Sequence, residues 1–252
     1  MHLIAPDSTL SHSVWMGEFM GTFILILLGN GVNASVNLRK TYAEGAGWMV
    51  ITTGWGIAVL CGVLTAQAFG SSGAHLNPAI TFSSAVVSGD FSPLANFWSA
   101  QLLGAMAGAT LTWLFFYPHW AVTPDPATKL GIFCTNAAIR HLPSNLLGEI
   151  TGTFVLVLVA NAIGSHGVSA SGPAPGLAPW LVASLVWGIG LSLGSTTGYA
   201  INPARDFGPR LMHFLLPIAG KGGSNWGYAW IPIVGDLTGA ALAGLLLRWA
   251  HF

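Results

Sequence analysis

"SSGAHLNPAI" (Ser71–Ile80) and "TTGYAINPAR" (Thr196–Arg205) are two polar interruptions in an otherwise apolar chain. Both contain Asn-Pro-Ala. Asparagine is among the best N-cap residues of helices, proline is favoured at the first helical position, and alanine extends a helix. Each stretch therefore predicts that a helix begins at its asparagine, in the middle of an apolar region. The two tripeptides are Asn77-Pro78-Ala79 and Asn202-Pro203-Ala204.

The composition around these stretches indicates a protein that lies in lipid. Of the 252 residues, 53% are hydrophobic and 6% are charged, whereas about a quarter of the residues of a soluble domain are charged. A formal net charge of zero provides no basic surface for nucleic acid. Cys61 and Cys134 allow at most one disulfide, and Met1–Leu10 lack the pattern of a cleaved signal peptide. We expect a multi-pass protein of the plasma (cell inner) membrane.

Six apolar stretches are long enough to cross a bilayer, which takes about 20 residues. They are Ser13–Ala34, Ala46–Phe69, Leu94–Tyr117, Leu146–Gly164, Ala178–Thr197 and Trp226–Trp249. Two further stretches, Asn77–Ser88 and Asn202–Leu216, follow directly on a span and are too short to cross. This pattern predicts an all-α membrane fold with two re-entrant half-helices. The longest polar connection is His119–Ser144, and the positions of Lys and Arg do not fix the orientation.

The two halves of the chain repeat each other. "GEFMGTF" (Gly17–Phe23) matches "GEITGTF" (Gly148–Phe154), and "QLLGAMAGATL" from Gln101 resembles "PIVGDLTGAAL" from Pro232. Because each copy crosses three times, the second copy enters from the opposite side and the repeat is inverted. Inverted repeats place the functional site near the midplane of the bilayer. We expect a single transmembrane domain over residues 1–252, with repeats at about 13–117 and 146–250.

Half-helices that enter from opposite faces meet end to end at the midplane. Their dipoles then place partial positive charge at one point. The oxygens of Asn77 and Asn202 would cap backbone N–H groups, and their NH₂ groups would point into a pore. A small neutral molecule with hydroxyl groups could exchange its hydrogen bonds to water for hydrogen bonds to these NH₂ donors. A cation or a proton would meet a positive barrier.

With these motifs the sequence resembles the major intrinsic protein family, the aquaporins and glycerol facilitators, from about Trp15 to Trp249. The resemblance rests on "GAHLNPA" (Gly73–Ala79), "GYAINPAR" (Gly198–Arg205) and the twin Gly-Glu openings. "NPARDFGPR" (Asn202–Arg210) is similar to the glycerol-conducting branch. The resemblance implies an aquaporin-like fold around a pore, a homotetramer, and a channel that needs no cofactor. The sequence does not rank glycerol and water against urea, dihydroxyacetone, hydrogen peroxide or undissociated lactic acid.

The resemblance also implies a narrow selectivity filter of four residues. They are Trp55, Gly190, Tyr199 and Arg205, with Trp48 as the alternative to Trp55. A glycine opposite aromatic rings would leave space for the carbon backbone of a solute, and Tyr199 adds a hydroxyl where glycerol facilitators commonly have Phe. Further residues are expected to line the pore with backbone carbonyls. They are Gly73, Ala74, His75, Leu76, Gly198, Ala200 and Ile201.

Arg205, Asp206, Glu18 and Glu149 are charged residues that fall within the apolar segments. An arginine inside lipid is costly and usually functional, and the resemblance gives Arg205 the role of donating hydrogen bonds to passing hydroxyls. The alternative is a structural ion pair between Arg205 and Asp206 or another acid. Asp206 complements the dipole of its half-helix and is expected to be structural. Glu18 and Glu149 are expected to accept hydrogen bonds from the non-helical backbone that leads into each half-helix.

Three other classes of function compete with a channel for small neutral solutes. Paired glutamates suggest acid–base catalysis, but the sequence holds no metalloprotease motif and no nucleophile with an evident base, and we expect no metal site. Coupled transporters also use inverted repeats and broken helices, but the buried charges are better placed for structure and filter. A formate-type anion channel has six spans and a repeat but lacks the paired Asn-Pro-Ala. We therefore predict a passive channel for glycerol, water and other small neutral solutes that excludes ions and protons.

Overall fold

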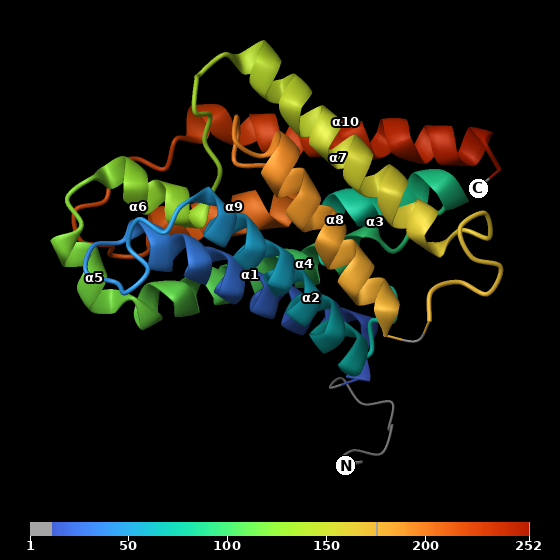
Figure 1. The fold of residues 1–252 in the computed structure, drawn as a ribbon, viewed down its shortest axis with the longest axis horizontal. Helices are drawn as coiled ribbons and strands as arrows, with labels where there is room; N and C mark the ends of the chain where they lie inside the picture. The colour runs from blue at the N-terminus through green and yellow to red at the C-terminus, as the bar shows by residue number, and fades with distance from the viewer. Residues whose placement is uncertain (1–11, 175, 252) are drawn as a thin grey trace.

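The computed structural model describes residues 12–174 and 176–251, and this part of the chain contains ten helices and no strand. Six of the helices are long and correspond to the six predicted spans (Figure 1). They are α1 (Val14–Asn37), α2 (Trp48–Ala68), α4 (Leu94–Phe115), α7 (Leu142–Gly164), α8 (Leu177–Leu193) and α10 (Trp226–Trp249). Among the described helices, α1, α2, α7 and α10 are long and apolar enough by themselves to cross a membrane. The helix α8, with 17 residues, is shorter than its predicted span.

The two half-helices begin where the sequence predicts. They are α3 (Pro78–Ser88) and α9 (Pro203–Leu215). The side chain of Asn77 accepts a hydrogen bond from the backbone N–H of Ala79, and Asn202 accepts from Ala204 and Arg205. Each asparagine is therefore an N-cap with proline at the first helical position.

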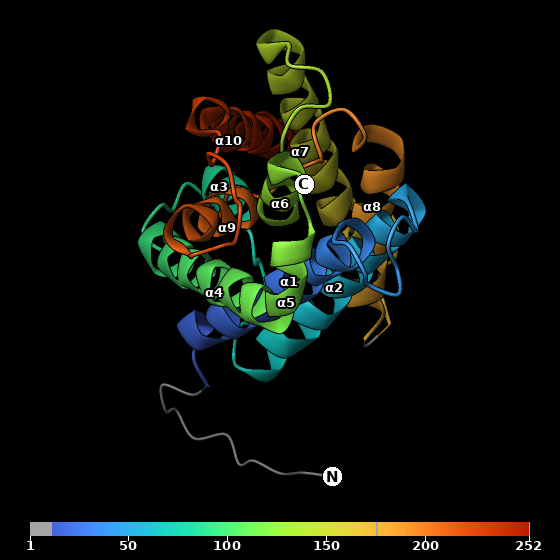
Figure 2. The same ribbon diagram turned by 90° about the vertical axis from the view of Figure 1, so that its left-hand side faces the viewer.

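The helices pack as two interlocked halves. Within each half the first helix contacts the second and the last, so that α1 lies against α2 and α4, and α7 lies against α8 and α10. The half-helices are exchanged, because α3 packs mainly on α10 and α9 mainly on α4. Figure 2 shows α10, α7, α8, α2, α1 and α4 in that order around the molecule, with α3 and α9 between α10 and α4.

Close helix crossings depend on glycines at equivalent places in the two halves. A Cβ at Gly108 of α4 would overlap the backbone of α1 at Phe23, and one at Gly239 of α10 would overlap the backbone of α7 at Ile150. Small residues at crossings let membrane helices approach closely, which replaces the hydrophobic driving force that lipid does not supply. The first and last helices of each half are therefore held at short range by backbone packing.

The connection His119–Ser144, which the sequence presented only as a polar loop, contains helix. Here lie most of α5 (Tyr117–Val122) and all of α6 (Pro126–Phe133). The Asp125 carboxylate caps α6 by accepting from Ala127 N and Thr128 N, and the hydrogen bonds from Thr128 and Ala127 lower the pKa of this carboxyl. Packing of α6 on α1 and α9 brings this connection against the core.

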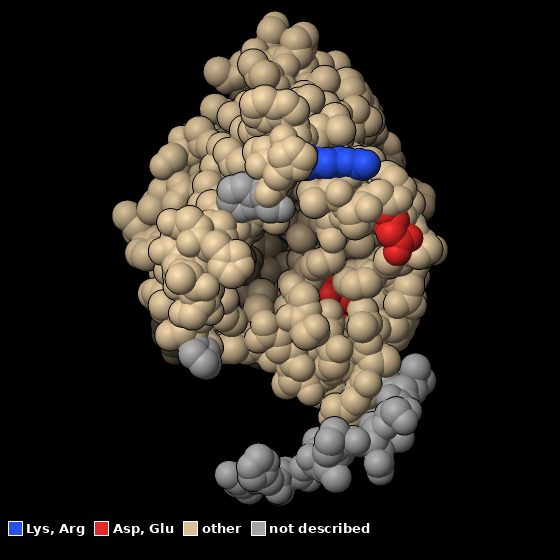
Figure 3. Space-filling model, turned by 90° about the vertical axis from the view of Figure 1, so that its right-hand side faces the viewer, with Lys and Arg blue, Asp and Glu red and all other residues tan. Residues whose placement is uncertain are grey.

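The surface carries little charge. Figure 3 shows the end of the molecule where the C-terminus lies, with few Lys, Arg, Asp and Glu side chains and a hollow at the centre. Large apolar side chains are exposed on the outer faces of the helices, among them Leu64, Leu114 and Leu245. Cys61 and Cys134 are both free thiols. Such a surface suits contact with lipid rather than water.

Candidate functional site

Two cavities lie inside the ring of helices and meet at a constriction. The central cavity has a volume of about 290 Å³ and reaches from His75 past both Asn-Pro-Ala segments. The vestibule, of about 710 Å³, lies beyond it and is lined by α6 and by polar residues such as Asn37, Asn136 and Asn225. Three residues line both cavities, namely Trp55, Tyr199 and Arg205. The narrow point between the cavities is therefore formed by these three side chains.

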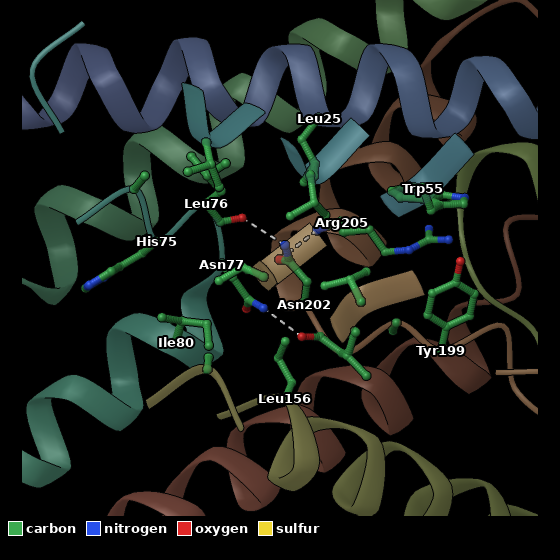
Figure 4. A pocket seen from close by; sticks show the side chains of 18 of the residues that line it. Leu25, Trp55, His75, Leu76, Asn77, Ile80, Leu156, Tyr199, Asn202 and Arg205 are labelled. Atoms are coloured by element: carbon green, nitrogen blue, oxygen red, sulfur yellow. Dashed lines mark hydrogen bonds between the residues drawn. The ribbon is translucent and has the colours of Figure 1, made fainter. Parts of the chain in front are cut away.

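The N-termini of α3 and α9 meet in the central cavity (Figure 4). The amide nitrogen Nδ2 of Asn77 donates to the carbonyl of Ile201 at 2.7 Å, and Nδ2 of Asn202 donates to the carbonyl of Leu76 at 2.8 Å. From the sequence we predicted that these NH₂ groups point into a pore. The structure corrects this, since one N–H of each amide binds the loop of the opposite half and only the second N–H is left for a solute.

The loops that lead into the half-helices have an unusual backbone. Alternate residues adopt positive φ without being glycine: Ala74 (41°), Leu76 (52°), Tyr199 (39°) and Ile201 (42°). Left-handed conformations of such residues store strain and occur where the surroundings enforce them, commonly at functional sites. Every residue of 73–76 and 199–201 lines the central cavity, and Gly198 lines the vestibule.

Glu18 is the support that enforces the first loop. Its buried carboxylate accepts from His75 N at 2.8 Å and from Leu76 N at 2.7 Å. The hydroxyl of Ser71 and the amide of Gln101 complete its shell at 2.6 and 2.8 Å. Four donors therefore satisfy one carboxylate, and the carboxylate satisfies backbone N–H groups that have no partner in a helix.

Glu149 supports the second loop in the equivalent way but with different neighbours. It accepts from Ala200 N at 3.3 Å and from Ile201 N at 3.1 Å. Where the first half has Gln101 as a donor, the second half has the fully buried Asp236 of α10, which interacts with Glu149 and accepts from Thr153 Oγ1 at 3.2 Å. Sequence reasoning missed Asp236. The available signal was the mismatch of "GAM" and "GDL" within the aligned repeats.

Trp55, and not its alternative Trp48, lies against the arginine. The guanidinium carbon of Arg205 is 4.1 Å from the centroid of the Trp55 ring, and the Trp55 indole N–H donates to Asn33 Oδ1 at 3.1 Å. Trp48 lines only the vestibule and not the central cavity. Its indole N–H donates to the carbonyl of Gly190 at 3.0 Å, and its ring contacts Tyr199 edge-on. Trp48 is thus at the mouth and Trp55 at the constriction.

Gly190 lines neither cavity, which corrects the expectation that it leaves space for solute opposite Trp55. A Cβ at this position would lie 2.8 Å from Cζ of Tyr199 and 2.9 Å from its hydroxyl oxygen. The space next to Gly190 is therefore filled by the Tyr199 ring. Gly190 therefore lies behind the constriction, where the absence of a side chain lets the Tyr199 ring pack close to α8.

Asp206 is paired with Arg210 and not with Arg205. Its carboxylate lies 2.9 Å from Arg210 Nε and accepts from Thr135 N at 2.8 Å, and all three groups are buried. The alternative of a structural pair between Arg205 and Asp206 is therefore wrong. Among the described residues no group hydrogen-bonds Nη1 of Arg205 or the hydroxyl of Tyr199, although both atoms are buried. Two open hydrogen-bonding groups thus remain at the constriction.

No metal centre is formed by the residues that the structure describes, since no three His, Cys, Asp or Glu side chains gather in one place. The cavity lining instead combines apolar side chains with polar backbone and a single arginine. Leu25, Val59, Leu156 and Val186 are the apolar part of the lining, and the strained loops with Arg205 are the polar part. Such a lining suits passage of a molecule that is itself partly apolar and partly polar.

Comparison with known proteins gives one consistent result. The family model "Major intrinsic protein" matches residues 7–247. The "Probable glycerol uptake facilitator protein" of Thermotoga maritima is 50% identical over 94% of this chain and 99% of its own length. The "Glycerol uptake facilitator protein" of Bacillus subtilis is 48% identical over 94% of this chain and 85% of its own. The X-ray structure of the aquaglyceroporin from Plasmodium falciparum superposes with a TM-score of 0.80 at 25% identity, covering 93% of this chain and 94% of that one.

Proposed function

The chain belongs to the major intrinsic protein family, and from this premise we propose that it is a passive channel for glycerol, water and other small neutral solutes that excludes ions and protons. It is a multi-pass membrane channel and not an enzyme. The observation that carries the proposal is the shared constriction, where Trp55, Tyr199 and Arg205 separate two cavities. Relatives named as glycerol uptake facilitators, at about half identity over nearly the whole chain, support glycerol as the solute.

The two walls of the central cavity match the two sides of glycerol. Apolar side chains from α1, α2, α7 and α8 would contact the carbon backbone. Arg205 Nη1, the Tyr199 hydroxyl and the loop backbone would exchange hydrogen bonds with the three hydroxyls, since the first two groups have no partner among the described residues. A linear polyol could then pass without leaving a hydroxyl unsatisfied, which would cost about 1–3 kcal/mol.

Exclusion of cations and protons is proposed from the charges along the same path. The dipoles of α3 and α9 place partial positive charge at Asn77 and Asn202, and Arg205 adds a full charge at the constriction. Fixed positive groups of this kind raise the barrier to cations and protons but not to neutral solutes. An anion would be attracted but would have to lose its hydration next to the apolar wall.

The proposed site consists of the Asn-Pro-Ala segments, the loops 73–76 and 198–201, and the filter Trp55, Tyr199 and Arg205 with Gly190 behind it. Glu18, Glu149 and Asp206 are proposed to be structural supports. We further propose one channel domain over 1–252, with repeats at about 13–117 and 146–250, and assembly into a homotetramer in lipid. Urea, dihydroxyacetone, hydrogen peroxide and undissociated lactic acid are proposed as further solutes.

Vesicle swelling tests the proposal. Purified protein in proteoliposomes is mixed with isosmotic glycerol, urea, dihydroxyacetone or an impermeant sugar, with and without an imposed ion gradient. We expect rapid swelling in glycerol that is independent of the gradient. Swelling that requires the gradient would indicate a coupled transporter, and swelling no faster than that of empty vesicles would overturn the proposal.

A further inference from the structure

We propose that Gly29 and Asn33 of α1 form a notch that fixes how far Trp55 projects into the constriction. These two residues would then set the solute size limit from outside the filter. The inference rests on the proposed function, because the position of Trp55 matters only if the constriction conducts solute.

Gly29 provides the space of the notch. A Cβ built on this residue would lie 2.5 Å from both Cε3 and Cη2 of the Trp55 ring. That separation is far below a normal carbon–carbon contact of about 3.5–4.0 Å. The benzene half of the indole therefore occupies the volume that any side chain at position 29 would take.

Asn33 holds the Trp55 ring in the notch by accepting a hydrogen bond from its indole N–H. It lies one helical turn after Gly29, so both residues are on the same face of α1. Its Oδ1 accepts the indole N–H of Trp55 at 3.1 Å, and Asn33 is only 6% exposed. Its Nδ2 points toward the carbonyls of Gly131 and Ile132 in α6, both at 3.4 Å. Since the amide nitrogen faces carbonyls, the amide oxygen is directed to Trp55, and the orientation of Asn33 is determined by α6.

Trp55 also borders the proposed path of the solute. The guanidinium of Arg205 lies over the ring at 4.1 Å, and Trp55 lines both cavities. Because the indole N–H is bound to Asn33, Trp55 has no free donor for a solute. Figure 4 shows Trp55 beside Arg205 at the same end of the cavity as Tyr199. The width of the constriction on this side is thus set by contacts that Trp55 makes with α1.

Changes at the two residues should act in opposite ways. A methyl group in Gly29→Ala would displace the ring away from α1, toward the cavities that it lines, and narrow the constriction. Asn33→Leu keeps a similar volume but removes the acceptor, so the ring loses its fixed point. The indole could then yield to a larger solute and would offer its N–H to the path.

The first test compares two alanine variants of the same helix by stopped-flow swelling, normalised to the amount of reconstituted protein. Gly31→Ala is the control, because a Cβ at Gly31 meets nothing within 4 Å. We expect Gly29→Ala to lower glycerol permeability about tenfold, the effect of a barrier increase of about 1.4 kcal/mol, with a smaller loss of water permeability. We expect Gly31→Ala to behave as the wild type. Equal behaviour of both variants would overturn the inference.

The second test is a double-mutant cycle of Asn33→Leu with Trp55→Phe, measured as the permeability ratio of erythritol, a four-carbon polyol, to glycerol. We expect Asn33→Leu to raise the ratio severalfold in the wild-type background and to leave it unchanged in Trp55→Phe, which has no indole N–H. An effect that persists in Trp55→Phe would show that Asn33 acts through another group and would overturn the inference. A wild-type protein that fails to conduct glycerol would overturn the proposed function instead.

Discussion

The side-chain amide of Asn77 donates a hydrogen bond to the backbone carbonyl of Ile201 across 2.7 Å. The bond joins the first half-helix to the loop of the second. Asn202 makes the equivalent bond to Leu76 at 2.8 Å, so the two halves of the chain are tied to each other twice at the centre of the molecule. Each asparagine therefore has two tasks, to cap its own helix and to hold the other loop.

The two tasks of Asn77 can be separated by substitution. Serine is as good an N-cap as asparagine, but its shorter side chain cannot reach Ile201, whereas alanine does neither. We expect Asn77→Ala to lose about 2 kcal/mol of unfolding free energy, about 1 each for the cap and the cross-bond, and Asn77→Ser to lose about 1. Unfolding in detergent measures both. Equal losses in the two variants would mean that the cap contributes nothing.

Glu149 should matter for folding more than for conduction. Glu149→Ala leaves the N–H groups of Ala200 and Ile201 without their acceptor, which should cost about 1–3 kcal/mol and lower the yield. Glu149→Gln keeps one acceptor oxygen, so its yield should fall only modestly. Glycerol flux per folded molecule is the second measurement. Complete loss of flux in well-folded Glu149→Ala protein would assign the residue a direct role in the pore.

Asp236 places a second carboxyl next to Glu149, where the first half has the amide of Gln101 next to Glu18. Two acids in contact in a buried site are unfavourable when both are charged. Asp236→Asn supplies an NH₂ donor for Glu149. We expect the free energy of unfolding of this variant to equal that of the wild type or to exceed it by up to about 1 kcal/mol. Thermal unfolding provides the measurement.

The control for Asp236→Asn is Gln101→Leu, which removes the amide donor to Glu18 in the first half. We expect this variant to unfold at a lower temperature than the wild type. If Asp236→Asn destabilised the protein as strongly as Gln101→Leu, the contact between the carboxyl groups of Asp236 and Glu149 would not be unfavourable, contrary to the prediction.

Gly190 should control selectivity through Tyr199. A side chain at position 190 meets the ring of Tyr199 and would push it into the constriction. We expect Gly190→Ala, and more strongly Gly190→His, to reduce glycerol flux much more than water flux, because a three-carbon chain needs more width than water in single file. Gly188→Ala is the control, since a Cβ at Gly188 meets nothing within 4 Å. An equal loss of both fluxes in Gly190→Ala would argue against this role.

The sequence predicted those features that depend on local chemistry. Asn-Pro-Ala specifies the start of a helix within three residues, and both half-helices begin at the expected proline. The six spans were located from the length of each apolar stretch, which is also a local property of the sequence. The end of α8 came earlier than predicted, because the chain leaves the helix at Gly194 and enters the loop that carries Tyr199.

Features that depend on which side chain fills which space were not predictable. The prediction for Gly190 was wrong, because a glycine in the sequence does not reveal which side chain fills the space beside it. Here the ring of Tyr199 fills that space. The hydrogen bond between Trp55 and Asn33 joins two helices and leaves no local pattern. The helix α6 was missed because Asp125 and Pro126, although a good N-cap and first residue, stand in a polar connection without apolar periodicity.

Simultaneous measurement of glycerol flux and ionic current tests whether the pore conducts glycerol without conducting ions. Vesicles or bilayers that contain purified protein are placed under a glycerol gradient, and the membrane current is recorded in potassium chloride over a range of voltages. We predict a glycerol flux well above that of bare lipid and an ionic current no larger than that of bare lipid. A measurable ionic current through the pore of each subunit, rising with the amount of protein, would contradict it.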